Sequence, residues 1–335
     1  MPAFFTESDA DPRALEGLAV ALIGYSELGS AAAHNLRESG LTVIIGTDDV
    51  QQADAARMAG FEAASAADAA ARSPIILLAH PDEDLHVCYQ EQVAPGLHVG
   101  DTLIFLSGYC LAFGLIEPPP FVDTVLIAPR GSGAALRQAY QAGTRAPSFI
   151  AVEQDSSGKA WKRALALAYA LGALRGGALE VTAQQEAELR LFTQQAILPV
   201  LHHLLTAAAE LLIREGYPPE ASLLELYLSG ELPRLLGESA QHGLIGALAR
   251  APRIAQYGLL SRLERFTDTK LVHQLEATLN EVRAGKFKQE WSSEYMNGAP
   301  RLAALRAKRA ALALWHHEER ARQMRDSAAP SSDDS

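Results

Sequence analysis

The sequence predicts an α/β Rossmann-type N-terminal domain followed by an all-α C-terminal domain. Near the start, an apolar run leads into a glycine turn, Val20–Gly29. Short apolar runs then alternate with Ala-rich helical patterns as far as Glu180, which indicates an α/β sheet. Beyond Glu180 the strand patterns stop, and long Leu/Ala-rich segments with helical periodicity continue to Arg325.

The glycine turn predicts a dinucleotide site. Val20–Ile23 is expected to be the first strand, and a helix is expected over Ala31–Arg37. The first glycine of the turn permits a tight bend, and the last lets the helix pack close to the strand. The middle glycine of G-x-G-x-x-G is absent, and the residue after that position is acidic, which we expect to weaken pyrophosphate binding. The predicted cofactor loop is Gly24, Tyr25, Ser26, Glu27, Leu28 and Gly29, with Ser26 at the middle position.

Further strands are expected at apolar runs that are short enough to be buried in a sheet. These runs are Thr42–Ile45, Glu62–Ala64, Ile75–Leu78, Thr102–Phe105, Thr124–Ile127 and Ser148–Val152. Helices are expected at Asp49–Ala59, Ala66–Arg72 and Gly158–Leu171. Because strands and helices alternate, the sheet should be mostly parallel and covered on both faces.

The domain limits follow from these patterns. We expect an N-terminal arm over 1–14, the Rossmann-type domain over 15–181, the helical domain over 182–325 and a disordered Ser/Asp-rich tail over 326–335. Helices of the second domain are expected at Gln184–Arg214, Ala221–Leu228, Leu232–Ala249, Lys270–Arg283 and Arg301–Arg325.

Composition restricts the function further. A chain of 335 residues, 48% hydrophobic and 21% charged, is ordinary for a globular protein of two domains. Its net charge of −11 argues against a nucleic-acid partner. Two cysteines without metal-type spacing, Cys88 and Cys110, favour the cytoplasm. We see no signal-peptide pattern and no uncharged apolar run of membrane-span length, so no membrane partner is expected.

Several motifs follow the glycine loop in a fixed order. They are His34–Gly40, Leu78–Glu83, Ile127–Gly133, Ala151–Ala160 and the C-terminal pieces Gly285–Phe287, Glu290-Trp291 and Asn297–Pro300. With the glycine loop they make the chain resemble the ketol-acid reductoisomerase (acetohydroxyacid isomeroreductase) family from about Leu15 to Arg325. The resemblance implies a knotted helical C-terminal domain. It also implies Mg²⁺-dependent isomerisation of 2-acetolactate and its reduction by NADPH, a step of branched-chain amino acid biosynthesis.

The metal ligands implied by the resemblance are substituted. Where the family has E-T-D-L-F-G-E-Q, this chain has Glu188–Gln195, so the ligand aspartate is Arg190 and the ligand glutamate is Gln194. A guanidinium among Mg²⁺ ligands would repel the ions by on the order of several kcal/mol. We therefore predict no metal site and no bound Mg²⁺.

The family's second acid pair, E-x-x-x-E, falls on Glu225 and Ser229, or in a shifted alignment on Tyr227 and Glu231. On a single helix, Glu225 and Glu231 would lie about 120° apart and could not act together. One carboxylate at best, Glu225, would be retained.

Two more chemical positions of the family differ. Ser107 stands at its active-site histidine and Arg130 at its active-site lysine. Arg130, Arg190 and Ser107 are thus the candidate catalytic residues, and two pocket arginines would favour a small anionic substrate. Alternatively, each is structural: Ser107 in a turn, Arg130 in a surface ion pair, and Arg190 on a solvated helix face.

The predicted cofactor is NAD(H) rather than NADP(H). Asp48 and Asp49 follow the second strand, about 20 residues beyond the glycine loop. A carboxylate there hydrogen-bonds a ribose 2′-hydroxyl and repels a 2′-phosphate. His80 and Pro81 follow another predicted strand beside the expected cofactor crevice.

Three hypotheses remain. The first is a ketol-acid reductoisomerase-like NAD(P)-binding protein whose parental activity is lost or altered; in one version it is a metal-independent NAD(H) reductase of a small carboxylate. The second is a pseudoenzyme, a non-catalytic paralogue acting as partner or regulatory subunit. The third is a working reductoisomerase with displaced ligands. In each, we expect a homodimer through the helical domain.

Overall fold

The computed structural model describes residues 2–267 and 269–327. They group into two compact units, and the division falls between Arg190 and Leu191. The strands of the first unit are β1 (Phe4–Phe5), β2 (Ala19–Ile23), β3 (Thr42–Gly46), β4 (Glu62–Ala64), β5 (Ile75–Leu78), β6 (Thr102–Phe105), β7 (Asp123–Pro129), β8 (Ser148–Gln154) and β9 (Ala178–Glu180). Its helices are α1 (Glu27–Glu38), α2 (Val50–Met58), α3 (Ala66–Ala71), α4 (Asp82–Cys88), α5 (Tyr109–Ala112), α6 (Gly133–Ala142) and α7 (Ala160–Ala170), and α8 (Ala183–Phe192) begins in it.

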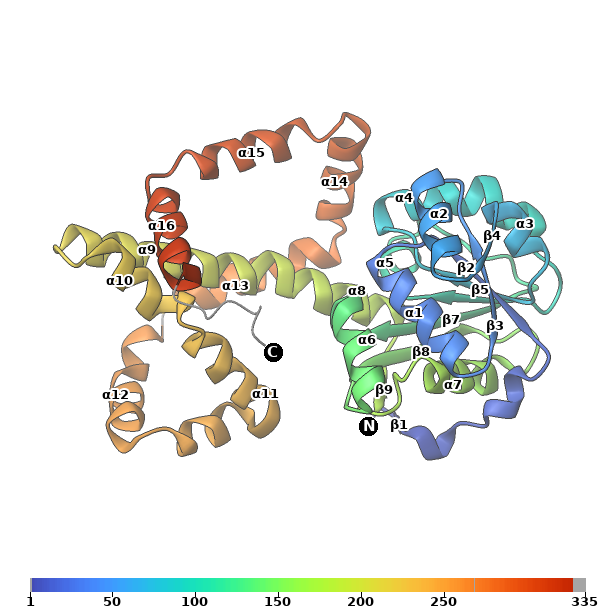
Figure 1. The fold of residues 1–335 in the computed structure, drawn as a ribbon, viewed down its shortest axis with the longest axis horizontal. Helices are drawn as coiled ribbons and strands as arrows, with labels where there is room; N and C mark the ends of the chain where they lie inside the picture. The colour runs from blue at the N-terminus through green and yellow to red at the C-terminus, as the bar shows by residue number, and fades with distance from the viewer. Residues whose placement is uncertain (1, 268, 328–335) are drawn as a thin grey trace. The chain divides into compact units, whose positions relative to one another are not determined.

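Within the described residues, the strands form one sheet in the order β1-β9-β8-β7-β6-β5-β2-β3-β4 (Figure 1). The strands from β7 to β4 in this order pair in parallel, β8 runs antiparallel to β7, and β1 runs antiparallel to β9. The mostly parallel sheet is therefore confirmed. The strand order reverses between β5 and β2, which is where open α/β sheets bind ligands.

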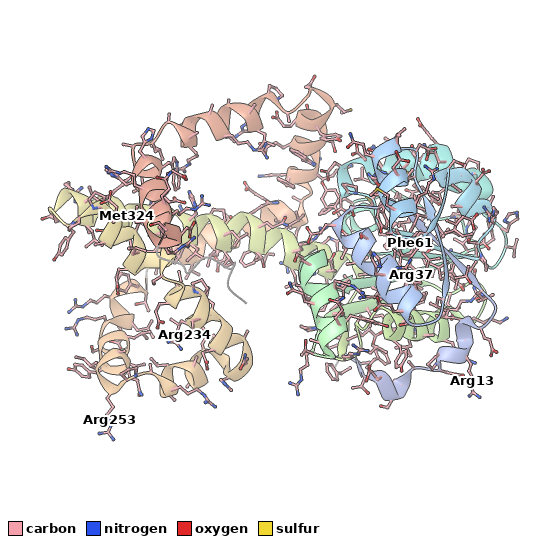
Figure 2. The ribbon with its side chains drawn as sticks, viewed as in Figure 1. Arg13, Arg37, Phe61, Arg234, Arg253 and Met324 are labelled. Atoms are coloured by element: carbon pink, nitrogen blue, oxygen red, sulfur yellow. The ribbon has the colours of Figure 1, made fainter. Side chains whose placement is uncertain are left out.

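The sheet is buried on both faces because its central strands are continuous apolar runs. Alternate side chains point to opposite faces. Val20 and Leu22 pack with α1 and α7, whereas α3 contacts β2 and β3 and packs against the turns over 89–96. All four residues of β5 are buried. At the rim of this core, Arg37 lies 4.0 Å over the ring of Phe61 (Figure 2).

The N-terminal arm takes part in the sheet. Phe4 pairs with Leu179 and Phe5 with Ala178, so β1 covers the edge of β9. Neither short strand was expected from the sequence, because each is defined by backbone pairing with strands far away in the chain. The predicted tail, 326–335, lies outside the described residues apart from Asp326 and Ser327, which end α16.

The second unit is all-α, as predicted. Its described helices are α9 (Leu198–Arg214), α10 (Pro219–Leu223), α11 (Glu231–Arg250), α12 (Arg253–Leu263), α13 (Thr269–Arg283), α14 (Lys286–Met296), α15 (Pro300–Ala310) and α16 (Leu314–Ser327). The expected single helix over Arg301–Arg325 is wrong, because the backbone turns between α15 and α16. Helix α11 has a non-helical residue at Gly243, and α12 and α14 were not expected. The knot implied by the resemblance stays a prediction.

One continuous helix, Ala183–Arg214, joins α8 to α9 through a π-helical turn, Thr193–Ile197. Among the described residues it is the one helix long and apolar enough to cross a membrane, by length and composition only. The expectation that no run reaches this length is therefore wrong: residues 191–209 include no Asp, Glu, Lys or Arg. Glutamines and histidines within the run obscured it in the sequence. A helix that docks against another protein chain can have the same composition.

Candidate functional site

The predicted cofactor residues meet at the carboxyl ends of three neighbouring strands. The loop Gly24–Gly29 follows β2, Asp48 follows β3, and His80 and Pro81 follow β5. Because β5, β2 and β3 are parallel and adjacent, their ends open on the same edge of the sheet. This edge is the crevice expected for a dinucleotide.

The two glycines of the loop are required by close contacts. Gly24 has a φ of +91°, and a Cβ there would lie 3.0 Å from the backbone N of His80. A Cβ on Gly29 would lie 2.5 Å from the carbonyl oxygen of Gly24. The loop is thus pressed against β5 and α1, in the form that leaves the start of α1 open to a phosphate.

Ser26 replaces the middle glycine without blocking the helix start. Its hydroxyl donates to the carbonyl of Ala79 (3.1 Å) and accepts from the backbone N–H of Gly29 (3.3 Å). It therefore caps α1 and ties the loop to the end of β5. Tyr25 is held from the other side, because its N–H donates to Oε1 of Gln52 at 2.6 Å.

A pocket of about 330 Å³ opens beside this loop. Its acidic lining residues are Asp48, Asp49, Asp84 and Glu91, and His80 is its one basic residue. Asp49 is engaged as the cap of α2, where Oδ1 accepts from the N–H of Gln52 at 3.0 Å. Asp48 is exposed at the pocket, so it is the carboxylate better placed to meet a ribose.

Cys88 lines the same pocket and remains a thiol at neutral pH. Burial raises its pKa to about 11, and the charge of Asp48 adds to the shift. Among the described residues that line the pocket there is no lysine or arginine.

A second polar cluster lies further along the same edge of the sheet. Asp82 follows β5, Ser107 follows β6, and Arg130 follows β7, while Glu186 and Arg190 lie one turn apart on α8. The structure thus brings together all three predicted catalytic candidates, Ser107, Arg130 and Arg190. It adds two carboxylates, Asp82 and Glu186, that the sequence did not single out.

Glu186 is the buried centre of this cluster, with a side chain only 1% exposed. Its Oε2 accepts from the N–H of Gly108 at 2.8 Å, and its Oε1 accepts from Nη1 of Arg130 at 2.8 Å. The guanidinium of Arg130 also lies over the ring of Phe149 at 4.9 Å. Arg130 is therefore fixed by Glu186 and is not a freely moving surface side chain.

Arg190 closes the other side of the cluster. Its Nη2 donates to Oδ2 of Asp82 at 2.8 Å and to the hydroxyl of Ser107, and that hydroxyl donates to Asp82 at 3.0 Å. Its Nε lies 3.6 Å from Oε1 of Glu186, too far for a hydrogen bond. This Nε is buried and has no hydrogen-bond partner in the described part of the chain.

Charges balance within the cluster, since two arginines face two carboxylates. Burial alone would lower the pKa of Arg190, but the carboxylates of Asp82 and Glu186 outweigh burial and raise it. Burial also raises the pKa of the neighbouring Tyr109 to about 12 and that of the Cys110 thiol still further. Arg190 is thus a permanent cation beside neutral hydroxyl and thiol groups.

The remaining predicted metal positions lie in the second unit and show no ligand set. Gln194 and Glu225 are exposed, and Glu231 pairs with Arg234 at 2.6 Å. Tyr227 donates to Glu318 at 2.9 Å. Glu225 and Glu231 do not share a helix, because a break at Gly230 separates the turn Leu224–Leu228 from α11. No group of three potential metal ligands occurs within residues 2–267 and 269–327.

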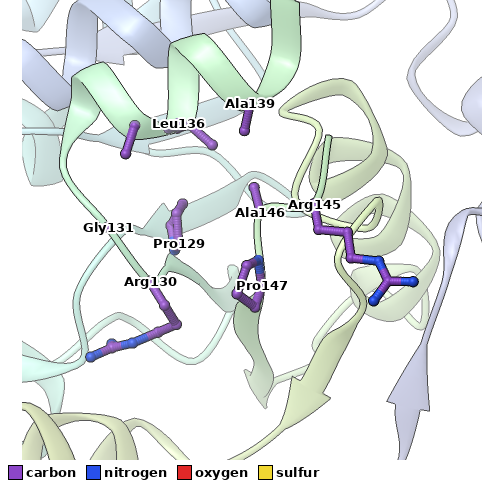
Figure 3. Close-up of a pocket in the computed structure, with 9 residues that line it drawn as sticks. Pro129, Arg130, Gly131, Leu136, Ala139, Arg145, Ala146 and Pro147 are labelled. Carbon is purple, nitrogen blue, oxygen red and sulfur yellow. The ribbon is translucent and has the colours of Figure 1, made fainter. Parts of the chain in front are cut away.

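A smaller pocket of about 80 Å³ lies behind Arg130, lined by apolar side chains that include Leu136 and Pro147. Figure 3 shows that Arg130 and Arg145 leave this pocket on opposite sides. The guanidinium of Arg130 is therefore directed toward α8 and not into the pocket.

Asp82 and Glu186 were the functional candidates that the sequence did not reveal. Asp82 stands inside the P-D-E motif, and Glu186 precedes Arg190 by one helical turn. An acid four residues before an arginine on a predicted helix is a signal for an ion pair, and it could have identified Glu186.

Models of two protein domains match nearly the whole chain. The acetohydroxy acid isomeroreductase NADPH-binding domain matches residues 14–177, and the ketol-acid reductoisomerase C-terminal domain matches residues 184–327. The chain belongs to the ketol-acid reductoisomerase family. The resemblance inferred from the motifs is confirmed, and so is the NAD(P)-binding nature of the N-terminal domain.

Named relatives agree with this assignment. The chain is 37% identical to a ketol-acid reductoisomerase (NADP(+)) from Pyrobaculum calidifontis, over 92% of this chain and 94% of the relative. It is 36% identical to the corresponding protein of Pyrobaculum aerophilum, over 91% and 93%. A solved NADH-preferring ketol-acid reductoisomerase from an uncultured archaeon superimposes with a TM-score of 0.89 at 30% identity, covering 96% of this chain and 98% of that one.

Proposed function

We propose that this chain is a ketol-acid reductoisomerase-family NAD(H)-binding protein in which the magnesium-dependent chemistry of the family is lost or altered. The observation that carries the proposal is the position of Arg190, whose guanidinium lies 2.8 Å from Asp82 and 3.6 Å from Glu186. Mg²⁺ is held by oxygen ligands, and its charge is repelled by a neighbouring cation. The residues present therefore do not fit a magnesium site.

The preference for NAD(H) is supported by the acidic pocket beside the glycine loop. Asp48 is exposed there, and neither lysine nor arginine lines the pocket. Family relatives are named for NADP(+), while the solved neighbour is named as NADH-preferring, so both cofactors occur among similar proteins. Separate fluorescence titrations test the preference. We expect tighter binding of NADH, and tighter binding of NADPH would contradict the role of Asp48.

A metal-independent reduction of a small carboxylate is the catalytic version of this proposal. Arg190 would supply the positive charge beside a reacting carbonyl that a metal otherwise supplies. Asp82 now holds that guanidinium, so an anionic substrate would have to exchange with this carboxylate. The side chain of Arg190 is 26% exposed, so an anion could reach its guanidinium for such an exchange.

A partner or regulatory role without catalysis is the alternative. In this role, as in the catalytic one, the helical unit would hold a partner chain; within its described residues, one core cluster consists of Ala209, Leu223, Leu314 and Ala321. Large apolar side chains on its helices stay exposed, among them Leu198, Leu204, Leu211, Ile245, Ile254 and Phe266. Apolar surface of this extent is typical of a face that another chain covers. We propose that a second copy of this chain covers it, giving a homodimer, and that the protein works in the cytoplasm, where both free cysteines stay reduced.

The deciding experiment incubates the purified protein with 2-acetolactate, Mg²⁺ and either NADH or NADPH while absorbance at the nicotinamide band is followed. We expect no Mg²⁺-dependent turnover together with measurable NADH binding. Mg²⁺-dependent oxidation of either cofactor would contradict the assignment of Arg190. A second incubation, with a small 2-keto acid and NADH but no Mg²⁺, tests the reductase version. Turnover there would favour the reductase over the partner subunit.

A paired variant tests the metal argument without relying on activity. Arg190→Asp combined with Gln194→Glu restores two carboxylates at the family's ligand positions. We expect millimolar Mg²⁺ to raise the melting temperature of this variant by several degrees, because a ligand that binds the folded state stabilises it. Wild-type protein and Arg190→Met should not respond. A rise in the wild-type melting temperature would show that the native chain binds the ion.

A further inference from the structure

Glu27 is the acidic residue in the cofactor loop, and its side chain does not point into a phosphate site. Its Oε1 accepts a hydrogen bond from the backbone N–H of Ala134 at 2.8 Å. Ala134 lies in the first turn of α6, where unpaired N–H groups and the helix dipole favour a negative charge. The carboxylate thus occupies the start of a different helix from the one that its own loop begins.

Contact between the two loops is tight at the backbone as well. A Cβ on Gly133 would lie 2.4 Å from the carbonyl oxygen of Glu27 and 2.8 Å from the N of Leu28. The turn that follows β7 is therefore seated directly on the peptide between Glu27 and Leu28. This same turn carries Arg130, three residues before Gly133. The cofactor loop and the Arg130 turn are therefore in direct contact, and we call the contact of Glu27 and Leu28 with Gly133 and Ala134 the joint.

Packing of α6 on α1 does not depend on this joint alone. Further along the two helices, Arg137 donates to Oδ1 of Asn35 at 2.8 Å and to Oε2 of Glu38 at 2.9 Å. Ser39 and Tyr140 share a further hydrogen bond of 2.7 Å. Losing the Glu27 carboxylate would therefore leave α6 attached to α1, and its consequence would be confined to the two loops.

We propose that Glu27 is a positioning residue for the dinucleotide: by holding the start of α6, its carboxylate fixes the cofactor loop in the form that binds pyrophosphate. The charge that would repel a phosphate is instead directed at the N–H groups that begin α6. The first-turn N–H groups of α1 stay available to the ligand, because Ser26 caps only Gly29. The proposal rests on dinucleotide binding, but it does not depend on which nicotinamide cofactor is preferred.

Three variants separate positioning from charge repulsion. Glu27→Gln keeps an oxygen that accepts from Ala134 N–H, whereas Glu27→Ala removes it, and Gly133→Ala forces the same joint apart from the other side. Dissociation constants are measured for NADH by fluorescence and for ADP-ribose by competition, since both contain the pyrophosphate. We expect Glu27→Ala and Gly133→Ala to bind both ligands roughly tenfold more weakly, and Glu27→Gln to stay within about threefold of wild type.

Arg137→Met is the matched control, because it loosens the same pair of helices away from the loop. It should lower the melting temperature about as much as Glu27→Ala while leaving both dissociation constants within about twofold. Equal or tighter binding by Glu27→Ala would mean that the charge repels the ligand and would overturn the proposal. Equal weakening by Arg137→Met would overturn it too. If wild-type protein binds neither NADH nor NADPH, this inference and the cofactor proposal both fail; tighter NADPH binding with the same order of variants removes only the preference for NADH.

Discussion

Two buried carboxylates, each with an arginine beside it, lie at opposite ends of the strands of one sheet. Asp123 lies at the amino ends, and Glu186, on α8, lies at the carboxyl ends. Asp123 begins β7 and is 0% exposed. It accepts from the N–H of Ser157 at 2.9 Å, from the hydroxyl of Ser157 at 2.6 Å and from that of Ser156 at 3.2 Å. Nη1 of Arg163 lies 3.6 Å away and donates to the carbonyl of Gly100 at 2.7 Å.

Glu186 has fewer fixed partners and a different location. It accepts one backbone N–H and one guanidinium, and a second guanidinium, that of Arg190, lies beyond hydrogen-bonding distance. It faces the carboxyl ends of β6 and β7, the edge at which α/β sheets bind ligands. The Asp123 network joins loops at the amino edge, where no ligand is expected. The ion pair of Asp123 thus stabilises the fold at the amino ends of the strands. At the carboxyl ends, the Glu186 cluster leaves the Nε of Arg190 without a hydrogen-bond partner in the described part of the chain.

Removing the Asp123 network should have the largest effect on the stability of the protein. Asp123→Ala leaves two serines without their acceptor and removes the carboxylate that faces Arg163. We expect the free energy of unfolding to fall by about 3–5 kcal/mol, the range for breaking a buried ion pair from one side. Urea unfolding followed by circular dichroism measures it. Ser156→Ala, which removes one hydrogen bond, should cost about 1 kcal/mol. A cost below 1 kcal/mol for Asp123→Ala would mean that the network is not structural.

Glu186→Gln should have a smaller effect on stability and a distinct effect on ligands. The amide can still accept from Gly108, but the cluster gains a net positive charge, so we expect a loss of about 2 kcal/mol. Inorganic phosphate should restore part of this stability, because an anion that binds only the folded cluster stabilises it.

The control for the phosphate response is Asp123→Asn, which removes the same charge at the enclosed site and should gain nothing from phosphate. Equal stabilisation of the two variants by phosphate would mean that the two carboxylate clusters do not differ in their access to ligands. No response from Glu186→Gln would mean that its cluster is as closed to ligands as the Asp123 network.

How far the sequence predicted these features depends on the length of the signal. The strand expected at Val20–Ile23 matches β2 to within one residue, and Ile75–Leu78 coincides with β5, because uninterrupted apolar runs bounded by turns define buried strands. The two-residue β1 pairs with β9, and the three-residue β9 pairs with both β1 and β8; no local sequence pattern indicates such pairing. The break between α15 and α16 falls in an alanine-rich stretch without proline or glycine, so propensity predicted one helix.

The sequence singled out individual positions of the candidate site, but it did not indicate which residues pair with one another. The order of the motifs placed Ser107, Arg130 and Arg190 at positions that the family uses for catalysis or metal binding. In the structure these three side chains lie in one cluster. The partner of Arg190 is Asp82, which lies 108 residues earlier in the chain. Only the parallel order of the strands brings the ends of β5 and β6 beside α8. Glu27 shows the same limit, since its partner Ala134 is 107 residues away.

A third carboxylate cluster surrounds Asp48, and no arginine is among the described residues that line its pocket. The thiol of Cys88 lies in the same pocket, so its reactivity can be used to measure the effect of these carboxylates. Since burial and then Asp48 raise the pKa of this thiol to about 11, its thiolate is scarce at pH 8 and increases about tenfold per pH unit up to that value. Iodoacetamide labelling of Cys88 should follow this profile. Asp48→Asn should speed labelling severalfold at pH 8, and NADH should slow it by occupying the pocket. Labelling that does not change with Asp48→Asn would place that carboxylate away from the thiol.

The smallest effect is expected at an exposed pair, Glu38 with Arg137, whose side chains are 44% and 20% exposed. The hydrogen bond from Arg137 lowers the pKa of Glu38 below its ordinary value. A lowered pKa in the folded state means that the stabilisation is present above the unfolded pKa, near 4.3, and is lost as the pH falls through the folded value. Glu38→Gln should therefore cost under about 1 kcal/mol at pH 7 and nothing near pH 2. Urea unfolding at both pH values measures the difference. A cost at pH 7 as large as that of Asp123→Ala would mean that pairing alone, and not burial, sets the strength of these ion pairs.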